Sequence, residues 1–343
     1  MGDVAMTVPV VKSLAQQYPD LRITVLSRPL ARPLFDGLAP NVGFMGADLK
    51  GEYRGLKGLN ALYRRLTAKN FTAIADLHSI LRSSYLRMRF NIDRYRVEHI
   101  DKHRAAGRAL TATHDKRLEP LPTSFDSYAD VLARLGYPVR LEFTSIFPDG
   151  GGRFDLIADK TGTKLPGEQW IGIAPFAAHK GQTYPIGQME RVVELLLERH
   201  PHCRIFLFGG ESDEHDTLAS WEGRHKSDTL ASWESRHERC TCASTLLGSL
   251  YRELVLMSHL DVIVSMDSAY MHLASLTATR VVSVWGATHP FAGFTGWHQA
   301  ASDAVQAPLP CRPCSILGNK PCLRGDYACL TSIKPEEIVE RVL

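Results

Sequence analysis

The stretch that decides the fold runs from Val262 to Leu276 and reads Val-Ile-Val-Ser-Met-Asp-Ser-Ala-Tyr-Met-His-Leu-Ala-Ser-Leu. It passes from an apolar run through a small polar group to apolar residues at helical spacing. A second apolar run, 281–285, follows. This order predicts strand, tight turn, helix and strand, which is the unit of a doubly wound α/β sheet.

The polar group after the first apolar run contains Asp267 and Ser268. In doubly wound sheets, ligands bind beyond the carboxyl ends of the strands, and helix N-termini there favour anions. Ser268 and the backbone amides that follow Asp267 are therefore predicted to hold a phosphate group. The same two residue types also cap helices, and spacing alone favours neither interpretation.

Similar patterns extend this unit over the rest of the chain. Apolar strand patterns at 170–174 and 204–208 flank a helical pattern at 186–200, and the Pro-Gly-rich segment 148–152 is the best linker candidate. A length of 343 residues suits two ordinary α/β domains. We predict a first domain over 1–158, a second over 159–333, and a C-terminal helix over 334–343 that crosses back to the first domain.

The beginning of the chain already has the pattern of a Gly-containing loop that enters a helix, over residues 1–14. An α/β domain normally has a strand before such a loop. We therefore expect that the first strand of the N-terminal domain is missing from this sequence.

Composition and charge limit the classes of partner. A net charge of +3 is too small to indicate nucleic acid, and we expect no such partner. No apolar run approaches the roughly 20 residues of a membrane helix, and no signal peptide opens the chain, so a cytoplasmic location is expected. Basic residues gather between Arg82 and Arg117. This run suits either a solvated helix face or a surface for an anionic acceptor or a phospholipid membrane.

Four of the seven cysteines, Cys311, Cys314, Cys322 and Cys329, form a Cys-x2-Cys-x7-Cys-x6-Cys pattern in a segment rich in Gly, Pro and Lys. In a cytosolic protein this pattern suits a structural zinc site. Reduced thiols that pack a loop against the second domain are the other interpretation, and disulfides are disfavoured in that compartment.

Four segments together resemble glycosyltransferase family 9, the lipopolysaccharide heptosyltransferases. They are Gly-Asp-Val at 2–4, Phe-Gly-Gly-Glu at 208–211, Ser-Met-Asp-Ser-Ala-Tyr-Met-His at 265–272 and Trp-Gly-Ala-Thr-His-Pro at 285–290. The resemblance implies a GT-B fold, in which two Rossmann-like domains face a central cleft. It places the acceptor site in the first domain and the nucleotide-sugar site in the second. It further implies ADP-activated heptose as donor, inversion at the anomeric centre, and no required cofactor or metal.

The resemblance also assigns roles to residues. Asp3 matches the catalytic base, although a plain helix cap is the other interpretation of that residue. The donor-side positions that match are Asp267, Ser268 and Ala269 for the diphosphate, His272 beside them, Glu211 for the ribose, and Gly248 for backbone contact with adenine.

One position departs from the family pattern. Gln182 stands where the family often has a lysine that neutralises the leaving diphosphate, and Lys180, two residues earlier, is the candidate replacement. In the first half, His78 and Arg82 match a segment near the acceptor.

The partners implied are a nucleotide sugar, a lipid-linked core oligosaccharide and the inner-membrane surface, which the protein would meet as a peripheral protein. Two alternatives stay open. One is a GT-B transferase or epimerase that uses another nucleotide sugar. The other is a catalytically impaired binding protein.

Overall fold

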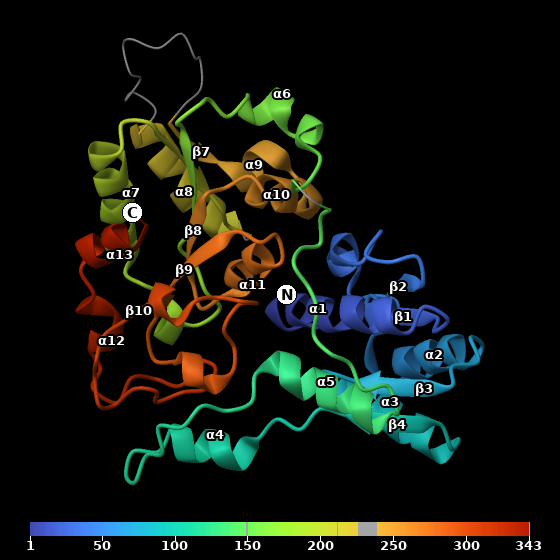
Figure 1. Cartoon of the computed structure of the whole chain (residues 1–343). Coiled ribbons are helices and arrows are strands. Elements are labelled where there is room, and N and C mark those ends of the chain that lie inside the picture. The colour runs from blue at the N-terminus through green and yellow to red at the C-terminus, as the bar shows by residue number, and fades with distance from the viewer. Residues whose placement is uncertain (149, 211, 226–238, 343) are drawn as a thin grey trace. The chain divides into compact units, whose positions relative to one another are not determined.

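In the computed structural model, the residues described are 1–148, 150–210, 212–225 and 239–342. The chain divides into two units (Figure 1). Unit 1 comprises Met1, Asp3–Arg104 and Pro122–Ile146, and unit 2 comprises Gly2, Ala105–Leu121 and Phe147–Leu343.

Unit 1 alternates helices with short parallel strands. Strand β1 pairs with β2, and β3 pairs with β4. The elements in chain order are α1 (Gly2–Gln17), β1 (Ile23–Ser27), η1 (Pro29–Leu34), β2 (Val42–Gly46), α2 (Gly55–Thr67), β3 (Ala73–Asp76), α3 (Leu81–Ile92), β4 (Arg96–His99) and α5 (Ser124–Arg134).

The amphipathic pattern of helix α2 explains one of the cores of unit 1. Its apolar residues recur three and four positions apart, so they form one stripe, and that stripe is buried. Leu62, Tyr63 and Leu66 of α2 pack in one cluster with Phe90 of α3 and Met45 of β2. The rings of Tyr63 and Phe90 pack edge to face, with their centroids 4.9 Å apart.

Unit 2 is built on a parallel six-stranded sheet whose order is β10-β9-β8-β5-β6-β7. Its strands are β5 (Gln169–Ala174), β6 (Cys203–Leu207), β7 (Cys240–Cys242), β8 (Val262–Met266), β9 (Arg280–Trp285) and β10 (Ala304–Gln306). Its helices are α4 (Arg104–Leu110, from Ala105 onward), α6 (Ala158–Thr161), α7 (Ile186–Arg199), α8 (Ser212–His225), α9 (Ala243–Leu247), α10 (Leu250–Met257), α11 (Ala269–Ser275), α12 (Ala328–Thr331) and α13 (Pro335–Val342).

The order of the strands reverses between β5 and β8. From β5 the chain winds outward through β6 and β7, then returns to β8 and winds outward the other way through β9 and β10. This is the doubly wound topology that the pattern at 262–285 predicts, and it creates a switch point at the carboxyl ends of β5 and β8. Every residue of β8 is buried, as expected for a strand covered on both faces.

The C-terminal helix α13 belongs to unit 2, and the expectation that it crosses back to the first domain stays a prediction. Its apolar residues Ile338, Val339 and Val342 are buried in the same core cluster as Val192 and Leu196 of α7. The apolar side of α13 is therefore buried against α7 and the sheet of unit 2.

Residues 105–121 also group differently from the predicted division at 158. They belong to unit 2, where the Lys116 ammonium donates hydrogen bonds to the backbone oxygens of Pro310, Cys311 and Pro313 at 2.8–3.2 Å. The amide of Leu121 donates to the carbonyl of Phe291. The division of the chain into 1–158 and 159–333 stays a prediction.

Among the described residues, no helix combines the length and the apolar character needed to span a bilayer.

Candidate functional site

The Asp3 carboxylate lies in the first turn of α1, where the helix dipole favours a negative charge. The position that caps this helix is Met1, so the interpretation of Asp3 as a plain cap does not hold. Oδ2 of Asp3 lies 3.6 Å from Nε2 of His78, and both side chains are more than half exposed. An exposed carboxylate next to an imidazole is able to accept a proton from a bound hydroxyl.

A buried carboxylate shapes the loop that carries His78. Asp76 ends β3, and its Oδ1 accepts hydrogen bonds from the amides of His78 and Ser79 at 3.1 and 2.8 Å. Ser79 adopts a left-handed backbone conformation with φ of 45°. These two bonds hold the tight turn that presents His78 beside Asp3.

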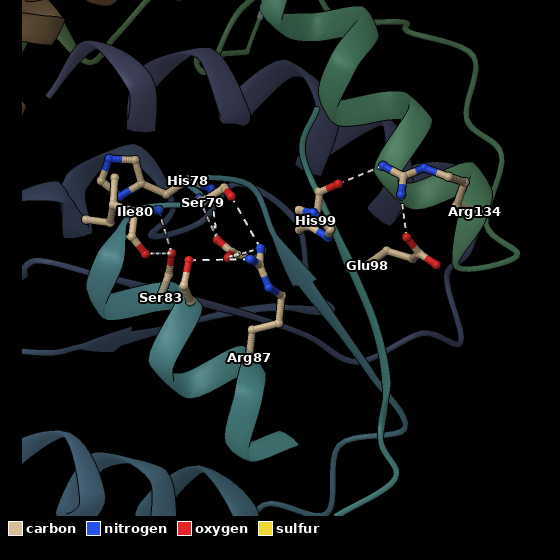
Figure 2. Close-up of polar contacts among 10 residues, drawn as sticks. His78, Ser79, Ile80, Ser83, Arg87, Glu98, His99 and Arg134 are labelled. Atoms are coloured by element: carbon tan, nitrogen blue, oxygen red, sulfur yellow. Dashed lines mark hydrogen bonds and ion pairs between the residues drawn. The ribbon is translucent and has the colours of Figure 1, made fainter. Parts of the chain in front are cut away.

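The second oxygen of Asp76 is paired with Arg87 of α3 at 3.1 Å, and Arg87 also donates to the hydroxyl of Ser79 (Figure 2). Sequence reasoning missed both Asp76 and Arg87. The available signal was an acidic residue at a strand end, followed by several arginines in the next helix. Of these arginines, Arg87 faces Asp76. Arg82, the predicted acceptor-binding cation, lies exposed in the first turn of α3, and its role stays a prediction.

Two further contacts fix the surroundings of this loop. Ser83 accepts a hydrogen bond from the amide of Ile80 and so closes the N-terminus of α3. Arg134 of α5 bonds with Glu98 and donates to the carbonyl of His99 at the end of β4, as Figure 2 shows. The carboxyl ends of β3 and β4 are therefore held by arginines from two different helices.

In unit 2, Asp267 follows β8 at the predicted switch point. Its side chain is buried, and Nε2 of Gln182 donates a hydrogen bond of 2.8 Å to its Oδ2. Burial raises the pKa of Asp267, and the hydrogen bond from Gln182 acts in the opposite direction. A buried carboxyl that is already paired within the protein is better suited to hold a loop in place than to bind a ligand directly.

The residues after Asp267 lie at the start of α11. Ser268 occupies the cap position, but its hydroxyl makes no cap hydrogen bond and lies 3.3 Å from the hydroxyl of Ser265. Ala269 begins the helix, and His272 is buried one turn further on. The cap interpretation thus holds for the position of Ser268 and not for its hydroxyl.

The loop after β9 approaches the loop after β5 closely. The amide of Ala287 donates to the carbonyl of Gly181, and a Cβ on Gly286 would lie 2.4 Å from that same oxygen. The buried guanidinium of Arg312 donates to the carbonyls of Gly286 and Thr288. This contact requires glycine at position 286, and it places Gln182 within reach of Asp267.

Lys180 lies in η3 (Lys180–Gln182), on the exposed surface. Its ammonium lies over the ring of Tyr327, 4.9 Å from the ring centroid, which is a cation–π contact. The predicted role of Lys180 at the leaving diphosphate stays a prediction.

A second polar cluster lies beyond the ends of β6 and β7, and sequence reasoning missed it. Glu253 of α10 is buried and accepts a hydrogen bond of 3.1 Å from the hydroxyl of Tyr270. Burial raises the pKa of Glu253 to about 7. Ser244 accepts a hydrogen bond from the amide of Gly209, immediately after β6. The signal in the sequence was a single acidic residue at the start of an otherwise apolar run, 254–257.

One predicted donor residue, Gly248, belongs to this region. Gly248 ends α9 in a left-handed conformation with φ of 65°, which suits glycine. Its amide donates to the carbonyl of Ser244. Glu211, the predicted partner of the ribose, lies outside the described residues.

The four cysteines of the C-terminal pattern are free thiols at different depths, with Cys311 exposed and Cys329 buried. Burial raises the pKa of Cys329 to about 11, so this thiol keeps its proton at neutral pH. Within the described part of the chain, no group of three or more His, Cys, Asp or Glu side chains is arranged to hold a metal ion. The described residues therefore do not form the predicted zinc site, and of the four free thiols only that of Cys329 is buried.

Comparison with known proteins agrees with the resemblance. The family model described as glycosyltransferase family 9 (heptosyltransferase) matches residues 59–320. Lipooligosaccharide heptosyltransferase 2 from Campylobacter jejuni subsp. jejuni serotype O:2 is 28% identical over 81 residues, which are 24% of this chain and 24% of that protein. The chain thus matches about a quarter of the length of this relative.

Solved structures match over almost the whole chain. The ADP-heptose LPS heptosyltransferase II of E. coli has a TM-score of 0.68 at 15% identity, with 98% of this chain and 93% of that chain covered. A family 9 glycosyltransferase from Veillonella parvula has the same TM-score at 18% identity, with 99% and 93% covered. The structure of the E. coli heptosyltransferase WaaC with ADP has a TM-score of 0.61 at 16% identity, with 100% of this chain and 97% of that chain covered.

These likenesses show that the chain has the GT-B fold of these enzymes. The family model covers more than half of the sequence, and its match includes the loop at His78 and the loop at Asp267. The chain therefore belongs to glycosyltransferase family 9, the heptosyltransferase family.

Proposed function

We propose that this protein transfers heptose, or a related sugar, from an ADP-sugar to the inner core of lipopolysaccharide. The observation that carries the proposal is the exposed Asp3 carboxylate beside His78, in a chain that belongs to the heptosyltransferase family. The donor is suggested by the similar structures of E. coli WaaC, one with ADP and one with ADP-2-deoxy-2-fluoro heptose.

In the proposed reaction, Asp3 is the general base. The acceptor hydroxyl gives its proton to the Asp3 carboxylate while its oxygen forms a bond to the anomeric carbon of the donor. The bond from that carbon to the β-phosphate oxygen breaks, and ADP leaves with the electron pair. Because one displacement occurs at one carbon, the anomeric configuration inverts. His78, 3.6 Å from Asp3, orients the carboxylate.

The donor binds at the switch point of unit 2 in this proposal. The hydroxyl of Ser268, which caps no amide, and the backbone around Ala269 contact the diphosphate, with His272 behind them. The Gln182–Asp267 pair holds this loop against the loop after β5. Lys180, exposed on η3, is the cation that we assign to the leaving diphosphate, and Glu211 and Gly248 are assigned to the nucleoside.

The acceptor in this proposal is a lipid-linked core oligosaccharide, met at the cytoplasmic face of the inner membrane. Arg82 lies exposed at the start of α3, six residues after β3 ends at Asp76. An arginine there suits a phosphate or carboxylate group on the core sugar. As the family resemblance implies, the reaction needs no metal ion.

Donor binding and transfer are best tested together. Calorimetry with ADP, GDP and UDP reports nucleotide preference, and mass spectrometry reports transfer from ADP-heptose to a heptose-deficient lipid core. We expect preference for ADP and transfer that persists after dialysis against EDTA. Asp3→Asn should lower kcat about 10²- to 10⁴-fold, because a general base contributes on this scale, and leave ADP affinity unchanged. Asp20→Asn, another exposed carboxylate of unit 1, is the matched control and should keep full activity.

Other outcomes point to the alternatives. Binding of ADP without transfer would indicate a catalytically impaired binding protein. Preference for UDP or GDP would indicate a GT-B transferase or epimerase that uses another nucleotide sugar. Product with the donor's anomeric configuration would exclude the single displacement at Asp3.

A further inference from the structure

The outer face of helix α3 carries large apolar side chains that the fold of unit 1 does not bury. Leu81 is 89% exposed, Ile92 is 66% exposed and Met88 is 48% exposed. With Tyr85, these residues recur at intervals of four, three and four positions, so they line one side of the helix over three turns. We call Leu81, Tyr85, Met88 and Ile92 the α3 stripe.

The packing of the same helix shows that the stripe is an outer face. Phe90 is buried in the core of unit 1, and on a helix it points away from the stripe. The hydroxyl of Tyr85 donates to Asn60 of α2. Leu56, one turn before Asn60 on α2, is 65% exposed and extends the apolar surface onto the neighbouring helix. Monomeric proteins rarely gather exposed apolar side chains in this way without a partner.

Positive charge borders the stripe. Segment 54–96, which spans α2, β3 and α3, contains ten Lys and Arg residues and only two acidic ones, Asp76 and Asp93. Asp76 is already paired with Arg87. Within the described part of the chain, no hydrogen bond or ion pair is recorded for Arg82. Arg89 is held by Asn60 and by the ring of Tyr63, which fixes its charge beside the stripe.

In the structure, some residues of the basic run 82–117 are bonded within the fold and others are exposed. Lys116 is taken up by backbone carbonyls of unit 2, and Arg87 and Arg96 are bonded within unit 1. Arg89 is also bonded within unit 1, to Asn60. Arg82 and Arg94 are exposed at the beginning and just past the end of α3. An apolar stripe with arginines at its edge matches an anionic bilayer surface, because the side chains enter the acyl boundary while the guanidinium groups stay at the phosphates.

We propose that the α3 stripe, bordered by Arg82, Arg89 and Arg94, docks the protein on the anionic surface of a phospholipid bilayer. The proposal rests on the proposed function, because a lipid-linked acceptor requires the enzyme to work at a membrane. The stripe begins at Leu81, three residues after His78. The docking face and the acceptor loop are therefore consecutive in the chain, and a sugar that projects from the bilayer at Leu81 lies next to the loop that carries His78.

A bilayer fits this surface better than a protein partner does. The arginines lie along one helix without an alternating acidic residue on its exposed face, and Asp93 is bonded to the hydroxyl of Tyr63. A membrane supplies both an apolar layer and a continuous anionic plane. A protein partner of the same extent would need both at matched positions.

Vesicle flotation of the full chain tests the proposal. We expect the protein to float with vesicles of phosphatidylethanolamine and phosphatidylglycerol, and to bind less in high salt because surface attraction is screened. The double variant Leu81→Ser/Ile92→Ser should lower partitioning about tenfold or more, since two large apolar side chains no longer enter the bilayer. The matched control is Leu30→Ser/Leu323→Ser, which removes two leucines that are 64% and 80% exposed elsewhere, and it should bind like the wild type.

Three results would overturn the proposal. They are the absence of flotation of the wild-type protein, equal flotation of both double variants, and a concentration-dependent dimer that only Leu81→Ser/Ile92→Ser abolishes. The last result would assign the stripe to a second copy of this chain. Thermal melts of both double variants should match the wild type, because all four side chains are exposed.

A second assay separates this proposal from the proposed function. Transfer to an acceptor in detergent micelles, or to a deacylated acceptor, should be equal in the wild type and in Leu81→Ser/Ile92→Ser. Transfer to the same acceptor embedded in vesicles should fall in the double variant only. If flotation behaves as expected and no transfer occurs with any acceptor, the docking surface stands while the proposed activity fails.

Discussion

The side-chain amide of Gln182 donates a hydrogen bond of 2.8 Å to Oδ2 of Asp267, and both side chains are buried. The two residues are 85 positions apart and end two different segments of unit 2, η3 and the turn after β8. A neutral amide here satisfies the carboxyl without adding a charge. Gln182, which stands where the resemblance implies a lysine, is therefore part of a formed contact within unit 2.

Gln182→Leu should destabilise the protein by about 1–3 kcal/mol, because it leaves a buried carboxyl oxygen without its donor. Urea unfolding measures the change in the free energy of unfolding. Gln16→Leu, at an exposed position of α1, is the control and should stay within about 0.5 kcal/mol of the wild type. Equal effects of the two substitutions would mean that the hydrogen bond contributes nothing to stability.

Glu253 should make stability depend on pH. Burial raises its pKa from an ordinary 4.5 to about 7, so the folded state holds a proton that the unfolded state releases. This contribution is complete below about pH 4.5 and is lost as the pH rises through 7, a change of about 3 kcal/mol. Glu253→Gln should flatten this part of the curve of unfolding free energy against pH. Glu119→Gln, at an exposed position, should leave the curve unchanged.

Arg87 and Arg82 should separate stability from acceptor binding. Arg87→Met removes the partner of buried Asp76 and should cost about 2 kcal/mol of unfolding free energy. Arg82→Met changes an exposed side chain and should alter stability by less than about 0.5 kcal/mol. In transfer assays, Arg82→Met should raise the KM for a phosphorylated acceptor several-fold. A stability loss in Arg82→Met as large as that in Arg87→Met would contradict the conclusion that Arg87, through Asp76, is the arginine that stabilises the loop after β3.

The cysteine segment should behave as free thiols in alkylation experiments. Cys311 is exposed and should react with iodoacetamide in the native protein, whereas buried Cys329, with a pKa of about 11, should react only after unfolding. Mass spectrometry of the labelled peptides reports both rates. Protection of Cys311 that a chelator removes would instead indicate a bound metal ion at the four cysteines.

The strand–helix alternation of unit 2 was predictable because it depends on local burial. The patterns at 170–174, 204–208 and 281–285 correspond to β5, β6 and β9 with bounds that differ by one residue at most. The Asp267–Ser268 turn also lies where the pattern places it, between β8 and α11. A buried parallel strand is apolar along its whole length, so its own residues identify it.

Side-chain pairing was not predictable in the same way. Gln182 and Asp267, Asp76 and Arg87, and Glu253 and Tyr270 meet because separate strand ends lie at one edge of a sheet or because a helix turns one face back. The sequence shows which residues are polar. Several arginines follow Asp76, however, and nothing in the sequence indicates which of them pairs with it. Only the rotation of α3 selects Arg87.

Taken alone, the amino-acid sequence determined the doubly wound class, the position of the turn after β8 and the family, since each depends on residues that are adjacent or regularly spaced. Only the tertiary structure decided that α13 packs on α7, that residues 105–121 join unit 2, and which cations of the basic run are bonded within the fold. The physical reason is that a side chain's partners are set by which faces of the elements come together, and that information is absent from local periodicity.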